Sequence, residues 1–411
     1  MSKTSKMAIW AWLLVLLYYF YQYALRSAPS VMMPQLSEAF GLNALGVASI
    51  VGLFYYGYSP FSLITGVSLD RLGLRKVIPL GTIAVGFGAI LFVSGNHTAA
   101  GVGRFLQGAG GAVPLVGAVY IVSKYFPPTK AATLIGATQM FGMAGGFAGQ
   151  FAVGPFIGSG FPWQYFWIIT GILGIFLGII LWIFLPKETR NEMPEKSLKS
   201  TVDAFKFVFT NPQSLLCGFI AAFLFIPTTI FDMVWGVRFI QEGYGLGFGD
   251  AVLRSSAVPF GWIIGCPLLG YISDRIGRRK PVIIGGSTVL LLCLTAALYG
   301  RVGVFPPYSI ALLVGVASGA GMIPYTVIKE ANPPQLSGTA TGVANFINFT
   351  FSAFMGQVFG WILVNVSDGS SHLMIRDYRI TFSPLLFGVA LAMMMTFFLK
   401  ETGPSNKKAR S

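Results

Sequence analysis

The sequence predicts an all-α integral membrane protein with twelve transmembrane helices in two pseudo-symmetric six-helix bundles. Three observations support this fold class. Of the 411 residues, 54% are hydrophobic and only 10% are charged, well below the roughly 25% of charged residues in a typical soluble domain. The apolar residues form long runs that are separated by short charged loops. One of these loops occurs twice, about half a chain length apart.

Twelve segments are long and apolar enough to cross a membrane, since a spanning helix needs about 20 apolar residues. They are residues 8–34, 44–66, 77–95, 100–124, 131–157, 163–185, 213–240, 250–273, 281–299, 306–328, 338–364 and 380–399. The longest polar interval separates the sixth helix from the seventh. It predicts an N-terminal bundle over residues 1–185, a cytoplasmic linker over 186–212 and a C-terminal bundle over 213–411. Residues 198–209 of the linker have the pattern of an amphipathic surface helix.

The repeated loop indicates that the two halves are related. Residues Gly66–Lys76 and Gly270–Lys280 both read G-x-x-x-D-R-x-G-x-R-K, and the offset between them is 270 − 66 = 204 residues. A second repeat is Pro127-Pro128 before the fifth helix and Pro333-Pro334 before the eleventh, at an offset of 333 − 127 = 206. Parallel six-helix repeats are one of the known transporter architectures.

The formal net charge of +14 fits either a nucleic-acid-binding protein or a membrane protein with basic cytoplasmic loops. Lys and Arg lie in short clusters beside hydrophobic runs, which is typical of cytoplasmic loops. With both termini in the cytoplasm, 21 of the 28 basic residues are cytoplasmic, whereas five are external or at outer helix ends: Arg238, Arg254, Arg301, Arg376 and Arg379. We therefore predict a multi-pass protein of the cell inner membrane with cytoplasmic termini and no nucleic-acid partner.

Several motifs together resemble the major facilitator superfamily. They are the two charged loops, the segment Arg104–Gly110 (RFLQGAG) that begins the fourth helix and the segment Pro186–Thr189 (PKET) that ends the sixth. The resemblance covers the whole chain. It implies transport by alternating access, without a cofactor, in a monomer whose partners are a small-molecule substrate, protons and the lipid bilayer.

The first helix indicates a particular branch of this superfamily. Residues 25–36 (LRSAPSVMMPQL) are similar to organic-anion and organophosphate transporters of the superfamily, in which an arginine at the position of Arg26 binds the anionic substrate. A second arginine, in the seventh helix of those proteins, has no counterpart here, where residues 225–232 read FIPTTIFD. That departure argues against a phosphate-ester substrate.

Two charges lie deep in predicted helices, Arg26 in the first and Asp232 in the seventh. A charge at such a depth costs about 2.5–3.5 kcal/mol on insertion scales, so it usually faces a cavity or a partner. We expect Arg26 to bind a carboxylate or similar anion, and Asp232 to bind a proton or an amine. The alternative is a structural ion pair between the halves. For Arg104, the resemblance implies proton coupling or helix contacts.

Polar residues near these charges complete the predicted substrate site. They are Tyr19, Gln22 and Tyr23 on the face of Arg26, Thr229 and Trp235 on the face of Asp232 by the i, i+3, i+4 rule, Tyr325 in the tenth helix and Asn345 in the eleventh. Each tyrosine has packing as its alternative role, and Asn345 has an interhelical hydrogen bond.

The charged loops have a predicted gating role. Asp70 should lie beside the start of the eleventh helix near Ser337–Thr339, where a carboxylate is favoured by about 0.3–1 kcal/mol, and Asp274 should lie similarly near Thr129. The predicted gating residues are Gly66, Asp70, Arg71, Gly73 and Arg75, with Gly270, Asp274, Arg275, Gly277 and Arg279 in the second copy. The alternative is that the basic residues only set the topology. Glu330 is interpreted as an ordinary interfacial charge.

Other function classes lack their signatures. The sequence has no phosphate-binding loop for ATP, no metal-ligand spacing among its Cys and His residues and no nucleophile or paired-carboxylate set for an enzyme. The sequence therefore predicts a secondary transporter of a small polar solute that is anionic or zwitterionic: an organic acid, an amino acid or a peptide. We expect proton-coupled symport. The alternatives are an exporter of amphipathic compounds and, from another class, a membrane receptor or enzyme.

Overall fold

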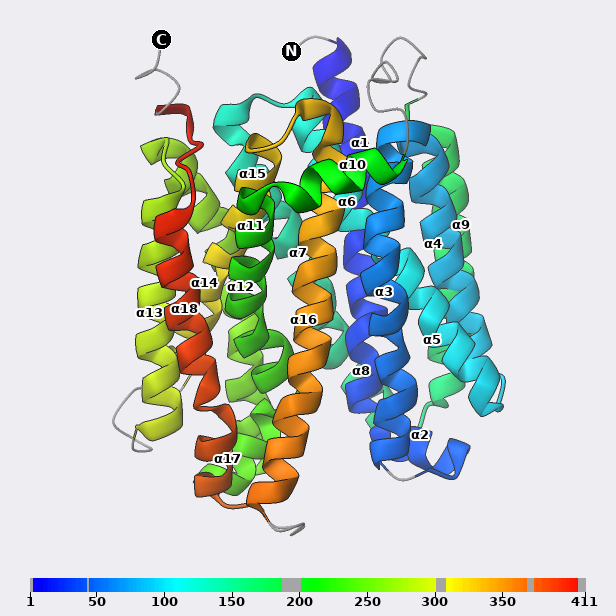
Figure 1. Cartoon of the computed structure of the whole chain (residues 1–411). Helices are drawn as coiled ribbons and strands as arrows, with labels where there is room; N and C mark the ends of the chain where they lie inside the picture. The colour runs from blue at the N-terminus through cyan, green and yellow to red at the C-terminus, as the bar shows by residue number, and fades with distance from the viewer. Residues whose placement is uncertain (1–2, 43, 187–200, 301–307, 368–372, 406–411) are drawn as a thin grey trace. The chain divides into compact units, whose positions relative to one another are not determined.

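The computed structural model describes residues 3–42, 44–186, 201–300, 308–367 and 373–405 (Figure 1). These residues form helices and connecting turns, without a strand among them. Eleven helices in the described part of the chain are long and apolar enough to cross a membrane. The predicted fifth span is α7 (Ala131–Phe151), which has 21 residues but is not among the eleven. Its glycines, threonines and Gln139 lower its mean hydropathy.

The chain divides into two compact units that do not follow chain order throughout. Unit 1 contains Met1–Pro127, Phe141–Asn211 and Asn332–Phe346, and unit 2 contains Pro128–Met140, Pro212–Ala331 and Ile347–Ser411. The first part of α7 therefore belongs to unit 2, and the first part of α16 (Ser337–Val366) belongs to unit 1. Residues 187–200 of the predicted linker, and with them most of the PKET motif, lie outside the described residues. The end of the linker forms α10 (Thr201–Thr210), close to the predicted amphipathic helix.

Unit 1 is built from the predicted first, second, third, fourth and sixth helices, with shorter segments between them. Its elements are α1 (Lys3–Ser27), a 3-10 turn (Ala28–Val31), α2 (Met33–Phe40), α3 (Ala44–Leu72), α4 (Leu74–Phe92), α5 (His97–Gly111), α6 (Val113–Tyr125), α8 (Val153–Gly158), α9 (Trp163–Phe184) and α10. The first helix ends at Ser27 rather than at residue 34. Pro29 lacks a backbone N–H donor, which favours the end of an α-helix here.

Unit 2 contains more irregular helices. Its elements are α11 (Pro212–Ile226), two π-helical segments (Pro227–Gly236 and Phe239–Gly243), α12 (Phe248–Ile276), α13 (Lys280–Tyr299), α14 (Ser309–Ser318), a 3-10 turn (Gly319–Met322), α15 (Ile323–Glu330), α17 (Ile375–Phe382) and α18 (Pro384–Phe398). The predicted seventh helix thus changes from α to π geometry at Pro227. A π-helix bonds residue i to i+5 and rotates the side chains that follow away from their α-helical positions.

Glycines allow close packing of the helices that carry the site residues. In unit 1, α3 packs against α5, and a Cβ atom on Gly108 would meet the carbonyl oxygen of Phe54. In unit 2, α12 packs against α14, and a Cβ on Gly315 would meet the carbonyl oxygen of Val258. Small residues permit this approach in membrane helices. The close approach brings the side chains of Phe54 and Val258 to the sites described below.

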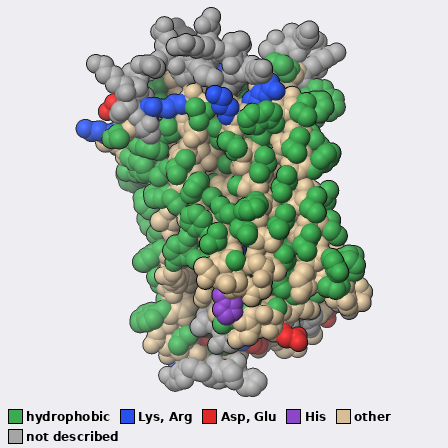
Figure 2. Space-filling model, turned by 90° about the vertical axis from the view of Figure 1, so that its right-hand side faces the viewer, with side chains coloured by type: hydrophobic (Ala, Val, Ile, Leu, Met, Phe, Trp, Pro, Cys, Tyr) green, Lys and Arg blue, Asp and Glu red, His purple; other side chains and the backbone are tan. Residues whose placement is uncertain are grey.

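The outer face of α4 and α9 in unit 1 is apolar (Figure 2). Its exposed side chains include Leu80, Phe87, Ile172, Phe176 and Ile183. Lys and Arg side chains gather at one end of this face. An exposed apolar band with basic residues at its end is what a lipid-facing surface requires.

Candidate functional site

Arg26 lies in unit 1 among aromatic rings. Its guanidinium carbon is 5.0 Å from the ring centroids of both Tyr23 and Tyr55 and 5.5 Å from that of Phe54. Its Nη2 donates a hydrogen bond to the Tyr55 hydroxyl at 3.1 Å. Contacts between a cation and aromatic faces are worth about 0.5–2 kcal/mol each. They hold the guanidinium in place while its planar edge remains suited to a carboxylate.

Gln22 lies about one helical turn before Arg26 and is almost fully buried, with 1% of its surface exposed. Neither its Oε1 nor its Nε2 atom has a hydrogen-bond partner among the described residues. A buried polar group without a partner costs about 1–3 kcal/mol. The amide of Gln22 is therefore suited to bind water or a polar ligand beside Arg26.

The other predicted residues of this region have mainly structural contacts. Tyr19 is buried and packs edge-to-face on Tyr23, with ring centroids 5.0 Å apart. The Nδ2 of Asn345 donates to the Tyr58 hydroxyl at 3.2 Å. Because Tyr58 also lies 5.8 Å from the Arg26 guanidinium, Asn345 orients one ring of the aromatic set. The structure thus keeps Tyr19, Gln22 and Tyr23 beside Arg26, as predicted, and connects Asn345 to Arg26 through Tyr58.

Arg104 is fully buried in α5 and connects helices. Its Nη1 donates to the carbonyl oxygen of Leu25 at 3.3 Å and to Oε1 of Gln107 at 2.6 Å, and its guanidinium lies 5.2 Å from the Phe54 ring. These contacts join α5 to α1 at the residue before Arg26. They support the helix-contact role, while proton coupling by Arg104 stays a prediction.

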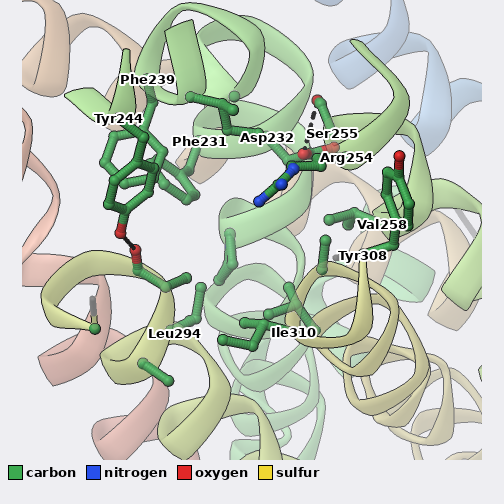
Figure 3. A pocket seen from close by; sticks show the side chains of 18 residues that line it. Phe231, Asp232, Phe239, Tyr244, Arg254, Ser255, Val258, Leu294, Tyr308 and Ile310 are labelled. Carbon is green, nitrogen blue, oxygen red and sulfur yellow. Dashed lines mark hydrogen bonds between the residues drawn. The ribbon is translucent and has the colours of Figure 1, made fainter. Parts of the chain in front are cut away.

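Asp232 lies in the first π-helical segment of unit 2 and is buried. Its Oδ1 accepts a hydrogen bond from the Ser255 hydroxyl at 3.0 Å (Figure 3). Gly236 makes room for this pair, since a Cβ there would lie 2.8 Å from Ser255 Oγ and 2.9 Å from Asp232 Oδ1. The carboxylate faces a cavity of about 140 Å³ inside unit 2.

The predicted face around Asp232 is wrong, because it assumed α-helical spacing. Thr229 donates to the carbonyl oxygen of Phe225 at 3.1 Å, and Thr228 accepts from Trp262 Nε1 at 2.7 Å. Neither threonine nor Trp235 lines the cavity that Asp232 faces. The residues that do share it include Ser255 and Arg254 of α12, which sequence reasoning did not assign to a site. Ser255 had no signal, and Arg254 had been placed at an outer helix end.

Tyr325 in α15 is also buried, and its hydroxyl accepts a hydrogen bond from Asn348 Nδ2 at 3.1 Å. This bond joins α15 to α16 within unit 2. The structure therefore gives the hydroxyl a contact between helices, and a role for Tyr325 in substrate binding stays a prediction.

The first charged loop makes the predicted contact within unit 1. Asp70 Oδ1 accepts from the backbone N–H of Gly338 at 3.0 Å, and Oδ2 accepts from the N–H and hydroxyl of Thr339 at 2.7 and 2.6 Å. A Cβ atom on Gly66 would lie 2.5 Å from the Gly338 carbonyl oxygen. Gly73 has a φ of +77°, a conformation that favours glycine. The carboxylate therefore caps the first turn of α16.

The second loop makes the equivalent contact in unit 2, one turn beyond the predicted Thr129. Asp274 Oδ2 accepts from the N–H and hydroxyl of Thr133, both at 2.8 Å, and Oδ1 accepts from the N–H of Ala132 at 3.4 Å. Residues Pro128–Lys130 form a 3-10 turn, so α7 begins only at Ala131. Like its counterpart, Gly270 is in close contact with the helix it faces, at the carbonyl oxygen of Ala132.

Arg279 adds an ion-pair network to the second loop. It is fully buried and pairs with Asp274 at 2.6 Å and with Glu330 at 2.9 Å. Burial alone would lower the pKa of its guanidinium, but hydrogen bonds and negative charge from Glu330 and Asp274 raise that pKa above its ordinary value. The interpretation of Glu330 as an ordinary interfacial charge is therefore wrong. The remaining predicted arginines, Arg71 and Arg275, are exposed.

Comparisons with known proteins agree with this architecture. A family model described as Major Facilitator Superfamily matches residues 15–357. The hexuronate transporter of Bacillus subtilis is 26% identical over 369 residues, covering 82% of this chain and 84% of that protein. The 4-hydroxybenzoate transporter PcaK of Pseudomonas putida is 27% identical over 378 residues, covering 83% and 82%.

Solved structures show the same fold. The fucose:proton symporter FucP of E. coli has a TM-score of 0.73 at 17% identity, covering 95% of this chain and 98% of that one. The proton:xylose symporter XylE has a TM-score of 0.75 at 14% identity, covering 97% of each chain. The two six-helix repeats predicted from the sequence are thus those of a known transporter fold.

Proposed function

The chain belongs to the Major Facilitator Superfamily, and on that premise we propose that it moves a small hydroxylated carboxylic acid by alternating access in symport with protons. It is a multi-pass membrane protein and a secondary transporter, not an enzyme. Several relatives are transporters of hydroxylated carboxylates, namely hexuronate, gentisate and 4-hydroxybenzoate, which supports this substrate class. The fucose and xylose transporters of similar fold are proton symporters, which supports the coupling ion.

The observation that carries the proposal is the surroundings of Arg26. A guanidinium held by the rings of Tyr23, Tyr55 and Phe54 is suited to a carboxylate, because its planar fork matches the two oxygens. The amide of Gln22 lies one turn away and has no partner among the described residues. It is suited to hydrogen-bond a hydroxyl group of the same substrate. One cation with a neutral polar neighbour fits a monocarboxylate better than a phosphate ester.

The main test is uptake by purified protein in proteoliposomes. A panel of hexuronates, aldonates and hydroxybenzoates should include at least one substrate of the wild type. We expect Arg26→Gln to lower the uptake rate about ten- to a hundredfold, since a charge-assisted contact is worth about 1.5–3 kcal/mol. Arg26→Lys should recover only part of the rate. Full uptake by Arg26→Gln would overturn the assignment of this residue.

Arg238 provides a matched control for this experiment. It is exposed and pairs with Glu242 at 2.8 Å on the same helix turn, so Arg238→Gln removes an arginine without altering either candidate site. Its uptake should equal that of the wild type. The purified variants should also unfold within a few degrees of one another, so that a loss of uptake reports binding rather than folding.

Proton coupling is assigned to Asp232. It is a buried carboxylate in a membrane-spanning segment with one hydrogen bond, from Ser255, and such intramembrane carboxylates are typical of proton relays. In Asp232→Asn, a pH gradient should no longer drive accumulation, whereas exchange of internal for external substrate should continue. An unchanged response of that variant to the pH gradient would remove Asp232 from the coupling mechanism.

Asp70 and Asp274 are proposed as latches for alternating access. Each holds the first turn of a helix, α16 or α7, whose later residues belong to the other unit. Release of these bonds would free that turn. We further propose a monomer in the inner membrane with both termini cytoplasmic. Fusion of a green fluorescent protein to the C-terminus tests the orientation, since it fluoresces only when it is cytoplasmic.

A further inference from the structure

We propose that unit 2 contains a second binding site, for a small hydroxylated monocarboxylate, in the cavity lined by Arg254 and Asp232 (Figure 3). The inference rests on the proposed function for its substrate class, but it concerns a different site from that of Arg26. The cavity lies at the opposite end of unit 2 from the charged loop. Arg254 is near the start of α12, whereas Asp274 of the loop is near its end.

The cavity is enclosed by five helical segments, one of which is the second π-helical segment with Phe239 and Ile240. Phe231 and Asp232 come from the first π-helical segment, Arg254 and Ser255 from α12, Leu294 from α13 and Ile310 from α14. Its volume is about 140 Å³, which is the space of about five water molecules. That volume is comparable with a single aromatic or sugar ring and its substituents.

Arg254 supplies a cation for which the described residues provide no ion-pair partner. The guanidinium lies 5.9 Å from the ring centroid of Tyr308 and points into the cavity in Figure 3. Its buried Nε has no acceptor, and no carboxylate pairs with it among the described residues. An arginine has five N–H donors in a planar fork. Leaving the buried Nε–H unmatched in a largely apolar site is costly, so the site favours an acceptor, and a carboxylate matches the fork best.

Asp232 sets the second requirement. From the described residues its carboxylate accepts one hydrogen bond, from Ser255, although two carboxylate oxygens offer about four acceptor positions. A ligand hydroxyl can donate to those that remain. A second carboxylate on the ligand would be repelled by Asp232. The pair of side chains therefore selects one carboxylate and at least one hydroxyl.

The remaining wall is apolar and partly aromatic. Phe231 and Phe239 pack with their ring centroids 5.2 Å apart, and Val258, Leu294 and Ile310 complete the surface. Tyr244 adds no free donor, because its hydroxyl is bonded to the carbonyl oxygen of Ala297. Such a wall suits a compact apolar or aromatic body rather than a fully hydroxylated chain. A hydroxybenzoate has all three features.

The test is equilibrium binding of radiolabelled 4-hydroxybenzoate to the full chain in lipid nanodiscs. We expect the wild type to bind two molecules per chain, and Arg254→Gln and Arg26→Gln to bind one each. Arg238→Gln, the matched control, should still bind two. Unlabelled benzoate lacks the hydroxyl, so it should compete at the Arg254 site at least about tenfold more weakly than 4-hydroxybenzoate.

A second variant keeps the test decisive if Arg254→Gln does not fold. Ala311 lines the cavity, and Ala311→Phe should fill it and remove one bound molecule without changing any charge. If the wild type binds none, or if Arg254→Gln and Ala311→Phe bind as many molecules as the wild type, the cavity holds only water and the inference is overturned. If Arg26→Gln transports normally while Arg254→Gln loses one molecule, the proposed function falls and this inference stands. If Arg26→Gln loses uptake while Arg254→Gln binds as many molecules as the wild type, this inference falls and the proposed function stands.

Discussion

The two charged loops have the same sequence pattern, but they are built into their units differently. In both, an aspartate accepts hydrogen bonds from the second and third residues of a helix, Asp70 from α16 and Asp274 from α7. In unit 2, Arg279 also joins Asp274 to Glu330. In unit 1, the equivalent Arg75 is partly exposed and donates to the carbonyl oxygen of Trp182 at 2.8 Å.

A single position accounts for much of this difference. The Pro127 and Pro333 repeats are offset by 206, so Glu330 corresponds to residue 330 − 206 = 124, which is Lys124. With a lysine there, Arg75 has no carboxylate at the position that binds Arg279. The C-terminal segment adds to the asymmetry, since Glu401 accepts from the backbone N–H of Arg279 at 2.6 Å. The comparison separates the helix-capping aspartate, common to both loops, from the ion-pair network, present in one.

The largest effect is expected at Arg279. Arg279→Met leaves Asp274 and Glu330 as buried, unpaired carboxylates, and breaking a buried pair in this way costs about 3–5 kcal/mol. Arg75→Met should cost under about 1 kcal/mol, because that residue is partly exposed and bonds to a carbonyl. Unfolding of the purified variants in denaturant measures both. Equal losses for the two arginines would contradict the asymmetry.

The pH dependence of this contribution follows from the raised pKa of Arg279. A cationic group whose pKa is raised on folding contributes its full stability below its unfolded pKa and loses it only as the pH rises through the folded value. Both the ordinary and the folded pKa of an arginine lie far above pH 9, so the cost of Arg279→Met should be the same at about pH 6 and about pH 9. A cost that falls over this range would indicate that another group titrates in the network.

The second effect concerns transport and compares the two aspartates. Asp70→Asn removes the charged acceptor of three hydrogen bonds, each worth about 1.5–3 kcal/mol when one partner is charged. We expect it to abolish most uptake while insertion stays normal. Asp274→Asn should lower uptake less, because Arg279 still binds Glu330. Initial uptake rates in proteoliposomes, normalised to inserted protein, decide the order, and full uptake by Asp70→Asn would eliminate the latch.

The third effect compares the glycines that turn each loop. Gly73 has φ +77° and ψ 174°, a region that is essentially restricted to glycine and costs other residues about 1–3 kcal/mol. Gly277 has φ +69° and ψ 19°, a left-handed conformation that asparagine tolerates. Gly73→Asn should therefore lower the unfolding free energy more than Gly277→Asn. The reverse order would show that contact with Ser405, beside Gly277, outweighs backbone strain.

The sequence predicted those features that repeat or that depend on rare charges in apolar segments. The two halves, the contact of Asp70 with the start of α16 and the polar neighbours of Arg26 all followed from spacing and helix ends. The π-helical segment at Pro227 did not, because hydrophobic periodicity assumes α geometry and therefore misplaced Thr229 and Trp235. Glu330 and Arg254 were also missed. Their roles depend on side chains from other helices, and a single sequence does not show which helices pack together.

The smallest expected effect tests whether Lys124 is the cause of the asymmetry. Its ammonium lies 5.7 Å from the Tyr120 ring and 5.5 Å from that of Tyr125, so Lys124→Glu loses weak cation–π contacts and gains a carboxylate at the position equivalent to Glu330. We expect a coupling of about 0.5–1 kcal/mol between the two positions in a double-mutant cycle of Lys124→Glu and Arg75→Met. Lys206→Glu, at an exposed position of α10, is the control and should show no coupling to Arg75. If both lysine variants behave alike, the carboxylate of Glu330 alone does not explain the ion-pair network of unit 2. The contacts of Glu401 in the C-terminal segment are then the next to test.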